Sequence, residues 1–379
     1  MHIAYLTPEY PHAECTSSGG LGTSILNMAT ALVEKGQKVS VVVYGQKEDK
    51  IFQERGIDFY LIRQQTYKIG GWYFYRKYLQ RVLNDLVRNK GVDIIEAAEW
   101  TGITAFMRLE APLVLRLHGS DAYFCELEGR KQKWKNFLLE KVALKRADAL
   151  VSVSSYTAKL TQDIFHLRKE IDIVHNGISV ENFQPGIEKQ NTNEILYFGT
   201  IIRKKGVLEL AKAFNRVVTE NPKSQLTVIG KDTTDIFENI STLELFKGLL
   251  SPEAMQQFRY LKQVEYSEIK NHIQQADIVV LPSFAEALPM TWLEAMSMEK
   301  ALVTSNIGWA KEIMENGVTG FTVNPNDHIQ FSEKVICLLN NPEKRELMGK
   351  AARKKVEQNF AMQIVAEKNI RFYKSQLRD

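Results

Sequence analysis

The sequence lacks the features that mark several large classes of protein. It has no run of about 18 apolar residues, which a membrane-spanning helix needs, and its start, MHIAYLTPEYPH, has neither the basic part nor the long apolar part of a signal peptide. Its three cysteines, Cys15, Cys125 and Cys337, lie far apart without metal or pairing spacing, which is typical of a reducing compartment. The net charge of +4 is too small to indicate nucleic-acid binding. We therefore expect a cytoplasmic protein.

Three nucleotide-binding patterns are also missing. No G-x-x-x-x-G-K-[ST] is present, which excludes a P-loop NTPase. The only candidate for G-x-G-x-x-G begins at Gly20 and has Ile25 at the third glycine, which disfavours a nicotinamide-dependent oxidoreductase. No D-x-D occurs, so the sequence does not indicate a metal-bridged diphosphate site, and we expect no bound metal.

Apolar, strand-like runs alternate with amphipathic, helix-like runs along both halves of the chain. This alternation predicts parallel sheets covered by helices on both faces. At 379 residues the chain exceeds one ordinary domain. We therefore expect an α/β protein with two Rossmann-like doubly wound domains, a polar connection near residues 186–194, and a ligand-binding cleft between the domains. Thr23 or Ser24 is expected to cap the first long helix, and residues 351–378 are expected to be helical.

The stretch FAEALPMTWLEAM (residues 284–296) places two glutamates beyond the end of a predicted buried strand. Pro289 suits the first turn of a helix, whose free N–H groups form an anion site. The helix rises roughly 7–8 Å from Pro289 to Glu294. A phosphate therefore fits at the helix start, between the carboxylates of Glu286 and Glu294, which can accept hydrogen bonds from sugar hydroxyls.

This E-x7-E pair resembles the signature of the family 4 retaining glycosyltransferases, which have the GT-B fold. Other segments resemble the family in the same order along nearly the whole chain: Gly19–Gly20, His118–Asp121, Asn176–Pro185, Gly199 through Lys205–Gly206, Gly308 to Glu312, and Asn316–Pro325. The resemblance implies an acceptor-binding domain at residues 1–188, a domain for the nucleotide-sugar donor at 189–355, and a C-terminal helix at 356–379 that crosses back to the first domain.

The resemblance also implies a role for each matched residue. Glu294 would bind the ribose of the donor, Glu286 would bind hydroxyls of the transferred sugar, and Lys205 would neutralise the leaving phosphate. His118 would stand near the reacting carbon. The backbone would contact the diphosphate at Leu288, Met290, Thr291 and, from the first domain, Gly20.

The implied reaction moves a sugar from a nucleotide diphosphate sugar to a hydroxyl acceptor and keeps the anomeric configuration. The donor is a co-substrate, and no other cofactor is expected, because cationic side chains and helix dipoles would do the work of a metal. The sequence departs from the family where Thr200 stands in place of an arginine, and Arg203 is our candidate to replace it. A second departure is Pro289, which removes one N–H from the phosphate site.

Two other functions fit the same pattern. A nucleotide-sugar epimerase of similar fold would need no acceptor, and a sugar-phosphate binding module would keep the fold without catalysis. Taken singly, the proposed site residues also have plainer interpretations. Glu286 could complement a helix N-terminus, Glu294 could be a solvated helix residue, and Lys205 could belong to an ordinary basic loop.

Two basic stretches contain aromatic residues. Residues 63–90 have seven Lys or Arg against one acid, Asp85, and residues 130–146 have seven against Glu140. In the first stretch, Trp72, Tyr75, Leu79, Val82, Leu83 and Leu86 share a helical face, which we expect to be core. The alternative hypothesis is peripheral contact with an anionic membrane on its inner face, where lipid-linked acceptors would be found.

Overall fold

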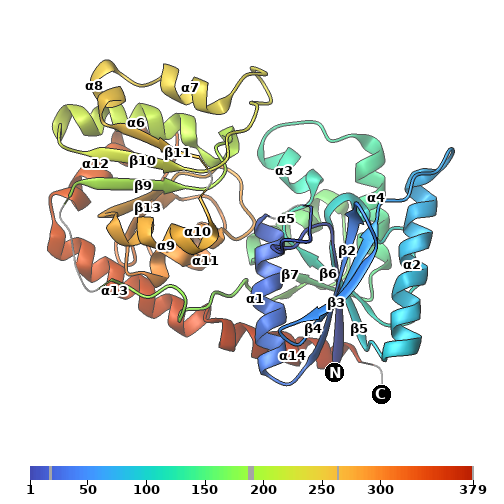
Figure 1. Cartoon of the computed structure of the whole chain (residues 1–379). Helices are drawn as coiled ribbons and strands as arrows, with labels where there is room; N and C mark the ends of the chain where they lie inside the picture. Colours follow the sequence, from blue (N-terminus) through green and yellow to red (C-terminus); the bar gives the residue numbers. More distant parts are fainter. Residues whose placement is uncertain (17–18, 187–191, 263, 378–379) are drawn as a thin grey trace. The chain divides into compact units, whose positions relative to one another are not determined.

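The chain forms two compact units in the computed structural model, which describes residues 1–16, 19–186, 192–262 and 264–377 (Figure 1). Unit 1 comprises Met1–Ser179 and Ala361–Asp379, and unit 2 comprises Val180–Phe360. The chain thus enters unit 2 before the polar run at 186–194, because Phe183 is already buried there and its carbonyl accepts a hydrogen bond of 3.1 Å from Arg353. Residues 187–191 of that run lie outside the described residues.

Unit 2 contains a six-stranded, wholly parallel sheet, as the alternation predicts. Its strands are β9 (Glu194–Phe198), β10 (Gln225–Ile229), β11 (Phe258–Leu261), β12 (Ile278–Leu281), β13 (Ala301–Ser305) and β14 (Phe321–Val323). They lie in the order β11-β10-β9-β12-β13-β14, the arrangement of a dinucleotide-binding fold. The chain order reverses between β9 and β12, and in such sheets ligands bind beyond the carboxyl ends of the strands at this switch point.

Helices cover both faces of this sheet (Figure 1). The largest buried stripe is on α6, where Leu210, Phe214 and Val217 follow helical spacing and pack toward α12. The helices of unit 2 are α6 (Val207–Glu220), α7 (Thr242–Gly248), α8 (Pro252–Gln256), α9 (Tyr266–Gln275), α10 (Met290–Ser297), α11 (Ala310–Ile313), α12 (His328–Leu339) and α13 (Pro342–Asn359). A 3-10 turn, η2 (Arg203–Lys205), precedes α6.

Unit 1 has an eight-stranded sheet in the order β3-β4-β2-β1-β5-β6-β7-β8, parallel except for β3, which pairs antiparallel with β4. The strands are β1 (His2–Thr7), β2 (Lys38–Gln46), β3 (Lys50–Glu54), β4 (Ile57–Arg63), β5 (Ile94–Ala98), β6 (Leu113–Leu117), β7 (Ala149–Ser152) and β8 (Asp172–Ile173). The sequence analysis did not anticipate β3, β4 or β11.

Two apolar layers sandwich the sheet of unit 1. Helices α2 (Gly71–Lys90) and α4 (Trp134–Arg146) pack on one face, and α1 (Gly20–Glu34) and α14 (Met362–Gln376) pack on the other. The remaining elements are α3 (Asp121–Leu127), α5 (Ser155–Phe165) and the 3-10 turn η1 (Trp100–Gly102). In the described residues, no helix is both long and apolar enough to cross a bilayer.

The expected helix over residues 351–378 is two helices, since α13 ends at Asn359 and α14 begins at Met362. The break belongs to the crossing between units, because α13 lies in unit 2 and α14 lies in unit 1. There α14 packs against α1 and contributes Val365, Phe372 and Tyr373 to the core of unit 1.

Candidate active site

Two loops meet at the switch point of unit 2. One follows β9 and carries Lys205, and the other follows β12 and carries Glu286. The Nζ atom of Lys205 lies 2.8 Å from Oε1 of Glu286. The backbone also joins the loops, because the amide of Phe284 donates to the carbonyl of Lys204 at 2.8 Å. The structure therefore brings together two of the residues that the sequence analysis placed at one site.

Gly206 explains why the two loops can approach so closely. Its φ of +71° is left-handed, and a Cβ atom at this position would lie 2.0 Å from the carbonyl oxygen of Pro282, at the end of β12. Only glycine therefore fits both the backbone conformation and the contact. Gly206 ends η2 and precedes α6, so it fixes the direction from which Lys205 faces Glu286.

The carboxylate of Glu286 has further polar neighbours. The hydroxyl of Ser283 donates to its Oε1 atom at 3.1 Å, and only 14% of the Glu286 side chain is exposed. Burial, and then the negative charge of Glu286, raises the pKa of Tyr197 well above its ordinary value. Tyr197 instead donates its hydroxyl proton to the carbonyl of Thr200, at 3.0 Å. Glu286 is thus held in place by its own loop and by β9.

The helix after Glu286 begins one residue later than expected. Pro289 is the N-cap of α10, with φ −70° and ψ 114°, and does not lie in the first turn. The first turn then starts at Met290, and no side chain caps it. The amides of Met290 and Thr291 belong to this turn, where N–H groups and the helix dipole favour an anion. Glu294, one turn further, is 4% exposed, so it is not a solvated helix residue.

Arg203 lies in the same loop as Lys205, but its guanidinium is held by a residue that the sequence analysis missed. Its Nε and Nη2 atoms donate to the two carboxylate oxygens of Asp235 at 2.7 and 2.9 Å, and it stacks on Phe237 at 5.2 Å. Arg203, together with the amides of Glu238 and Phe237, lowers the pKa of Asp235 to about 2. The replacement of the family arginine by Arg203 stays a prediction.

In unit 1, the glycine loop is organised by Glu9. The amide of Gly22 donates to Oε1 of Glu9 at 2.8 Å, and a Cβ atom on Gly19 would lie 2.9 Å from both carboxylate oxygens. Because Glu9 supplies the acceptor, α1 starts at Gly20, and the expectation that Thr23 or Ser24 caps the helix is wrong. A Cβ atom on Gly20 would meet no described atom within 4 Å, so its backbone is open on that side.

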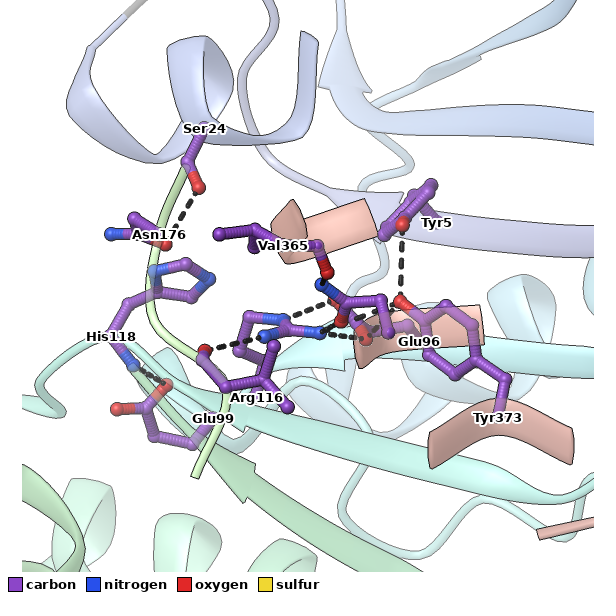
Figure 2. Close-up of polar contacts among 11 residues, drawn as sticks. Tyr5, Ser24, Glu96, Glu99, Arg116, His118, Asn176, Val365 and Tyr373 are labelled. Carbon is purple, nitrogen blue, oxygen red and sulfur yellow. Dashed lines mark hydrogen bonds and ion pairs between the residues drawn. The ribbon is translucent and has the colours of Figure 1, made fainter. Parts of the chain in front are cut away.

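His118 directly follows β6, and Glu99 directly follows the neighbouring strand β5. The amide of His118 donates to Oε2 of Glu99 at 3.0 Å (Figure 2). Burial raises the pKa of Glu99 to about 8, so this carboxyl group is protonated at pH 7. Burial, and then the positive charge of Arg116, lowers the pKa of His118 to about 3, so its imidazole ring is neutral at pH 7.

A buried polar network ties the strand that leads to His118 to the C-terminal helix (Figure 2). Arg116, in β6, donates to both oxygens of Glu96 at 2.7 and 3.0 Å, and to the carbonyl of Val174 at 3.2 Å. From α14, Asn369 accepts a hydrogen bond from Arg116, and Tyr373 donates to Glu96 at 2.7 Å. The sequence signal for this network was a charged residue inside each of two apolar strands.

Comparison with known proteins agrees with this geometry. Residues 18–182 match the family model described as Glycosyltransferase Family 4, and residues 179–355 match the model described as Glycosyl transferases group 1. A glycogen synthase of Mycobacterium tuberculosis is 26% identical over 295 residues, covering 74% of this chain and 68% of the relative. A GDP-mannose-dependent mannosyltransferase of Corynebacterium glutamicum, which acts on a monoacylated phosphatidylinositol monomannoside, is 25% identical over 322 residues, covering 78% and 79%.

Solved structures share the fold. Sucrose-phosphate synthase from Thermosynechococcus elongatus superimposes with a TM-score of 0.81 at 17% identity, covering 99% of this chain and 98% of that one. Anabaena HepE, determined with UDP and glucose, gives a TM-score of 0.75 at 16% identity, covering 99% and 100%. The matches support sugar transfer from a nucleotide-sugar donor in glycoconjugate or polysaccharide synthesis, and they give no support to an epimerase or a binding module. The chain belongs to the family 4, group 1 glycosyltransferases and has the GT-B fold.

Proposed function

We propose that this glycosyltransferase retains the anomeric configuration of the sugar and needs no metal ion. The observation that carries the proposal is the Lys205–Glu286 pair at the switch point of unit 2, 2.8 Å apart and followed by the N-terminus of α10. An ammonium group and free helix N–H groups supply the positive charge that a metal ion supplies at other diphosphate sites.

The arrangement assigns separate tasks to the two members of the pair. Lys205 stabilises the negative charge that grows on the leaving phosphate, and the amides of Met290 and Thr291 bind the diphosphate from the other side. Glu286 accepts hydrogen bonds from hydroxyls of the transferred sugar, and Glu294 accepts those of the ribose. When the donor binds, its diphosphate competes with Glu286 for Lys205, which leaves the carboxylate available to the sugar.

In unit 1, the neutral ring of His118 stands at the end of β6, and we place it near the reacting carbon. A neutral imidazole can donate or accept one hydrogen bond without adding charge to the site. The open backbone at Gly20 lets a phosphate approach the start of α1. Arg203 adds positive charge beside Lys205 while Asp235 holds its position.

We further propose a hydroxyl acceptor that is carried by a lipid, so that the enzyme works as a cytoplasmic protein at the membrane surface. The corynebacterial relative is named for an acylated phosphatidylinositol acceptor, and a Staphylococcus aureus relative, CapM, is named for capsular polysaccharide biosynthesis. Both names describe acceptors or products that are assembled on larger glycoconjugates.

The first test is a thermal-shift screen with UDP, GDP, ADP and their sugars, because a ligand that binds the folded state raises the melting temperature. With the donor found, Glu286→Gln should keep nucleotide binding and lose turnover, and equal activity would favour a binding module. The anomeric configuration of the product, read by NMR, tests retention. Full activity in EDTA tests metal independence, and a loss restored by a divalent cation would overturn it.

A further inference from the structure

Five aromatic rings form a continuous cluster on unit 1, around the start of α2. Ring contacts of 5.6 to 5.9 Å join Tyr67 to Phe74, Phe74 to Tyr73, Tyr73 to Trp72, and Trp72 to Phe106. Trp72 is 56% exposed and Phe74 is 49% exposed. The next turns of the same helical face are core as expected, with Tyr75, Leu79, Leu83 and Leu86 buried. The exposed rings at the helix start therefore do not serve the core.

Helix α4 adds exposed apolar side chains beside this cluster. Trp134, its first residue, is 70% exposed, and Leu138, one turn later, is 46% exposed. The two helices flank one segment of the chain. A Cβ atom on Gly102 would run into the backbone of Leu139, while Arg76 of α2 donates to the carbonyl of Gly102 at 3.2 Å. The starts of α2 and α4, with residues 100–106 between them, form what we call the aromatic–basic surface.

The charge of this surface is positive. Residues 130–146 have one acid, Glu140, and it is fully buried, where it accepts the amide protons of Asp121 and Ala122. Among the residues that the structure describes, six cations of this stretch have no carboxylate within ion-pair distance: Lys131, Lys133, Lys135, Lys141, Lys145 and Arg146. Near the ring cluster, burial and then the positive charges of Arg108 and Arg146 lower the pKa of Lys77.

The geometry points to an anionic lipid bilayer as the partner of the aromatic–basic surface. Trp and Tyr side chains prefer the level of the lipid headgroups, and each Lys or Arg near an anionic leaflet strengthens binding about fivefold. Exposed aliphatic side chains separate this partner from an acidic glycan. Ile69, 85% exposed, and Leu138 can enter the acyl boundary of a bilayer, whereas a glycan offers little apolar surface for them.

This inference deepens the proposed function and rests on it, because a membrane-docked unit 1 would meet a lipid-carried acceptor where that acceptor lies. The docking needs no transmembrane helix. A few inserted rings and several cations make an interfacial contact that is reversible and sensitive to salt.

The test is co-sedimentation of the full chain with vesicles of phosphatidylcholine alone and of phosphatidylcholine with phosphatidylglycerol. We expect binding only to the anionic vesicles, and we expect high salt to release it. Lys133→Gln/Lys135→Gln should weaken binding roughly 25-fold, since each cation contributes about fivefold. The matched control is Lys159→Gln/Arg168→Gln, which removes two exposed cations from the region of α5 and should bind as the wild type does.

The apolar part of the surface is tested by Trp72→Ser and Trp134→Ser, with Ile51→Ser as a control at another exposed apolar residue. Loss of vesicle binding in the two tryptophan variants alone supports the inference. Binding to dextran sulfate without binding to anionic vesicles would overturn it in favour of an acidic glycan, and binding to neither probe would overturn it altogether. Vesicle binding without nucleotide release from any donor would leave the docking surface standing and would contradict the proposed function.

Discussion

The Nζ atom of Lys205 and the Oε1 atom of Glu286 lie 2.8 Å apart, although 80 residues separate them and each follows a different strand. In this state each residue neutralises the other, so neither is an isolated charge in a partly buried site. Binding of a diphosphate would exchange one anionic partner of Lys205 for another. The ion pair therefore keeps the site organised before the donor arrives.

Removing the cation of this pair should abolish most of the activity. Without Lys205, the charge that develops on the leaving phosphate loses its nearest cation, so we expect Lys205→Met to lower kcat roughly 100- to 1,000-fold. Steady-state release of the nucleotide measures the loss. Lys223→Met, at an exposed cation just before the amino end of β10, is the matched control and should retain wild-type kcat. A fall of less than about tenfold for Lys205→Met would contradict the assigned role.

The Arg203–Asp235 pair should stabilise unit 2. Asp235→Asn removes a charge-assisted, two-pronged hydrogen bond, and we expect it to lower the free energy of unfolding by roughly 1–3 kcal/mol, measured with urea. Because the pKa of Asp235 is lowered to about 2, the stabilisation is complete above the ordinary aspartate pKa and is lost as the pH falls toward 2. The difference between wild type and variant should therefore shrink below about pH 4. Glu238→Gln, at an exposed neighbour, should show no such pattern.

Glu99 should give stability the opposite dependence on pH. Its pKa of about 8 means that the folded state holds a proton that the unfolded state has released between about pH 4.5 and pH 8. Folding therefore becomes less favourable as the pH rises through this window. Glu99→Gln removes the ionisation, so its stability relative to wild type should increase from pH 5 to pH 9. Urea unfolding at both values measures the change, and a constant difference would rule out a buried, protonated Glu99.

The network around Arg116 should be costly to break on one side only. Arg116→Met leaves Glu96 buried without its cation, and we expect a loss of about 3–5 kcal/mol. Arg116→Met/Glu96→Leu removes both charges and should recover much of that loss, because the desolvation of both ions is then avoided. The midpoint of thermal unfolding compares the two variants. If the double variant is less stable than the single one, the two charges do not act as a pair.

The doubly wound sheets could be predicted because their central strands are apolar on both faces, as in Val279 and Val280 of β12, and because helices with clear periodicity separate them. The strands at the edge could not. Exposed Glu54 and half-buried Phe52 alternate along β3, which is half solvated, and β11 is equally short and amphipathic. The alternation in β4, with Asp58 between buried Ile57 and Phe59, was a usable signal that was overlooked.

The residues of the site could be placed at strand ends, but their partners could not. The motif that contains Lys205 and the motif that contains Glu286 both follow central strands, so their meeting follows from topology. The partner of Arg203 could not be found in this way, because Asp235 lies in a loop whose path depends on tertiary packing. Glu9 is a similar case, since its carboxylate reaches α1 across 13 residues of irregular chain.

The contribution of α14 to unit 1 has a consequence for biosynthesis. The first 179 residues leave the ribosome without Val365, Phe372 and Tyr373, and with Arg116 and Glu96 still lacking Asn369 and the Tyr373 hydroxyl. The intervening 181 residues of unit 2 are contiguous and can complete their own core first. We therefore expect co-translational maturation to run against the direction of synthesis, with the segment made first reaching its native state last, after the final codons are read.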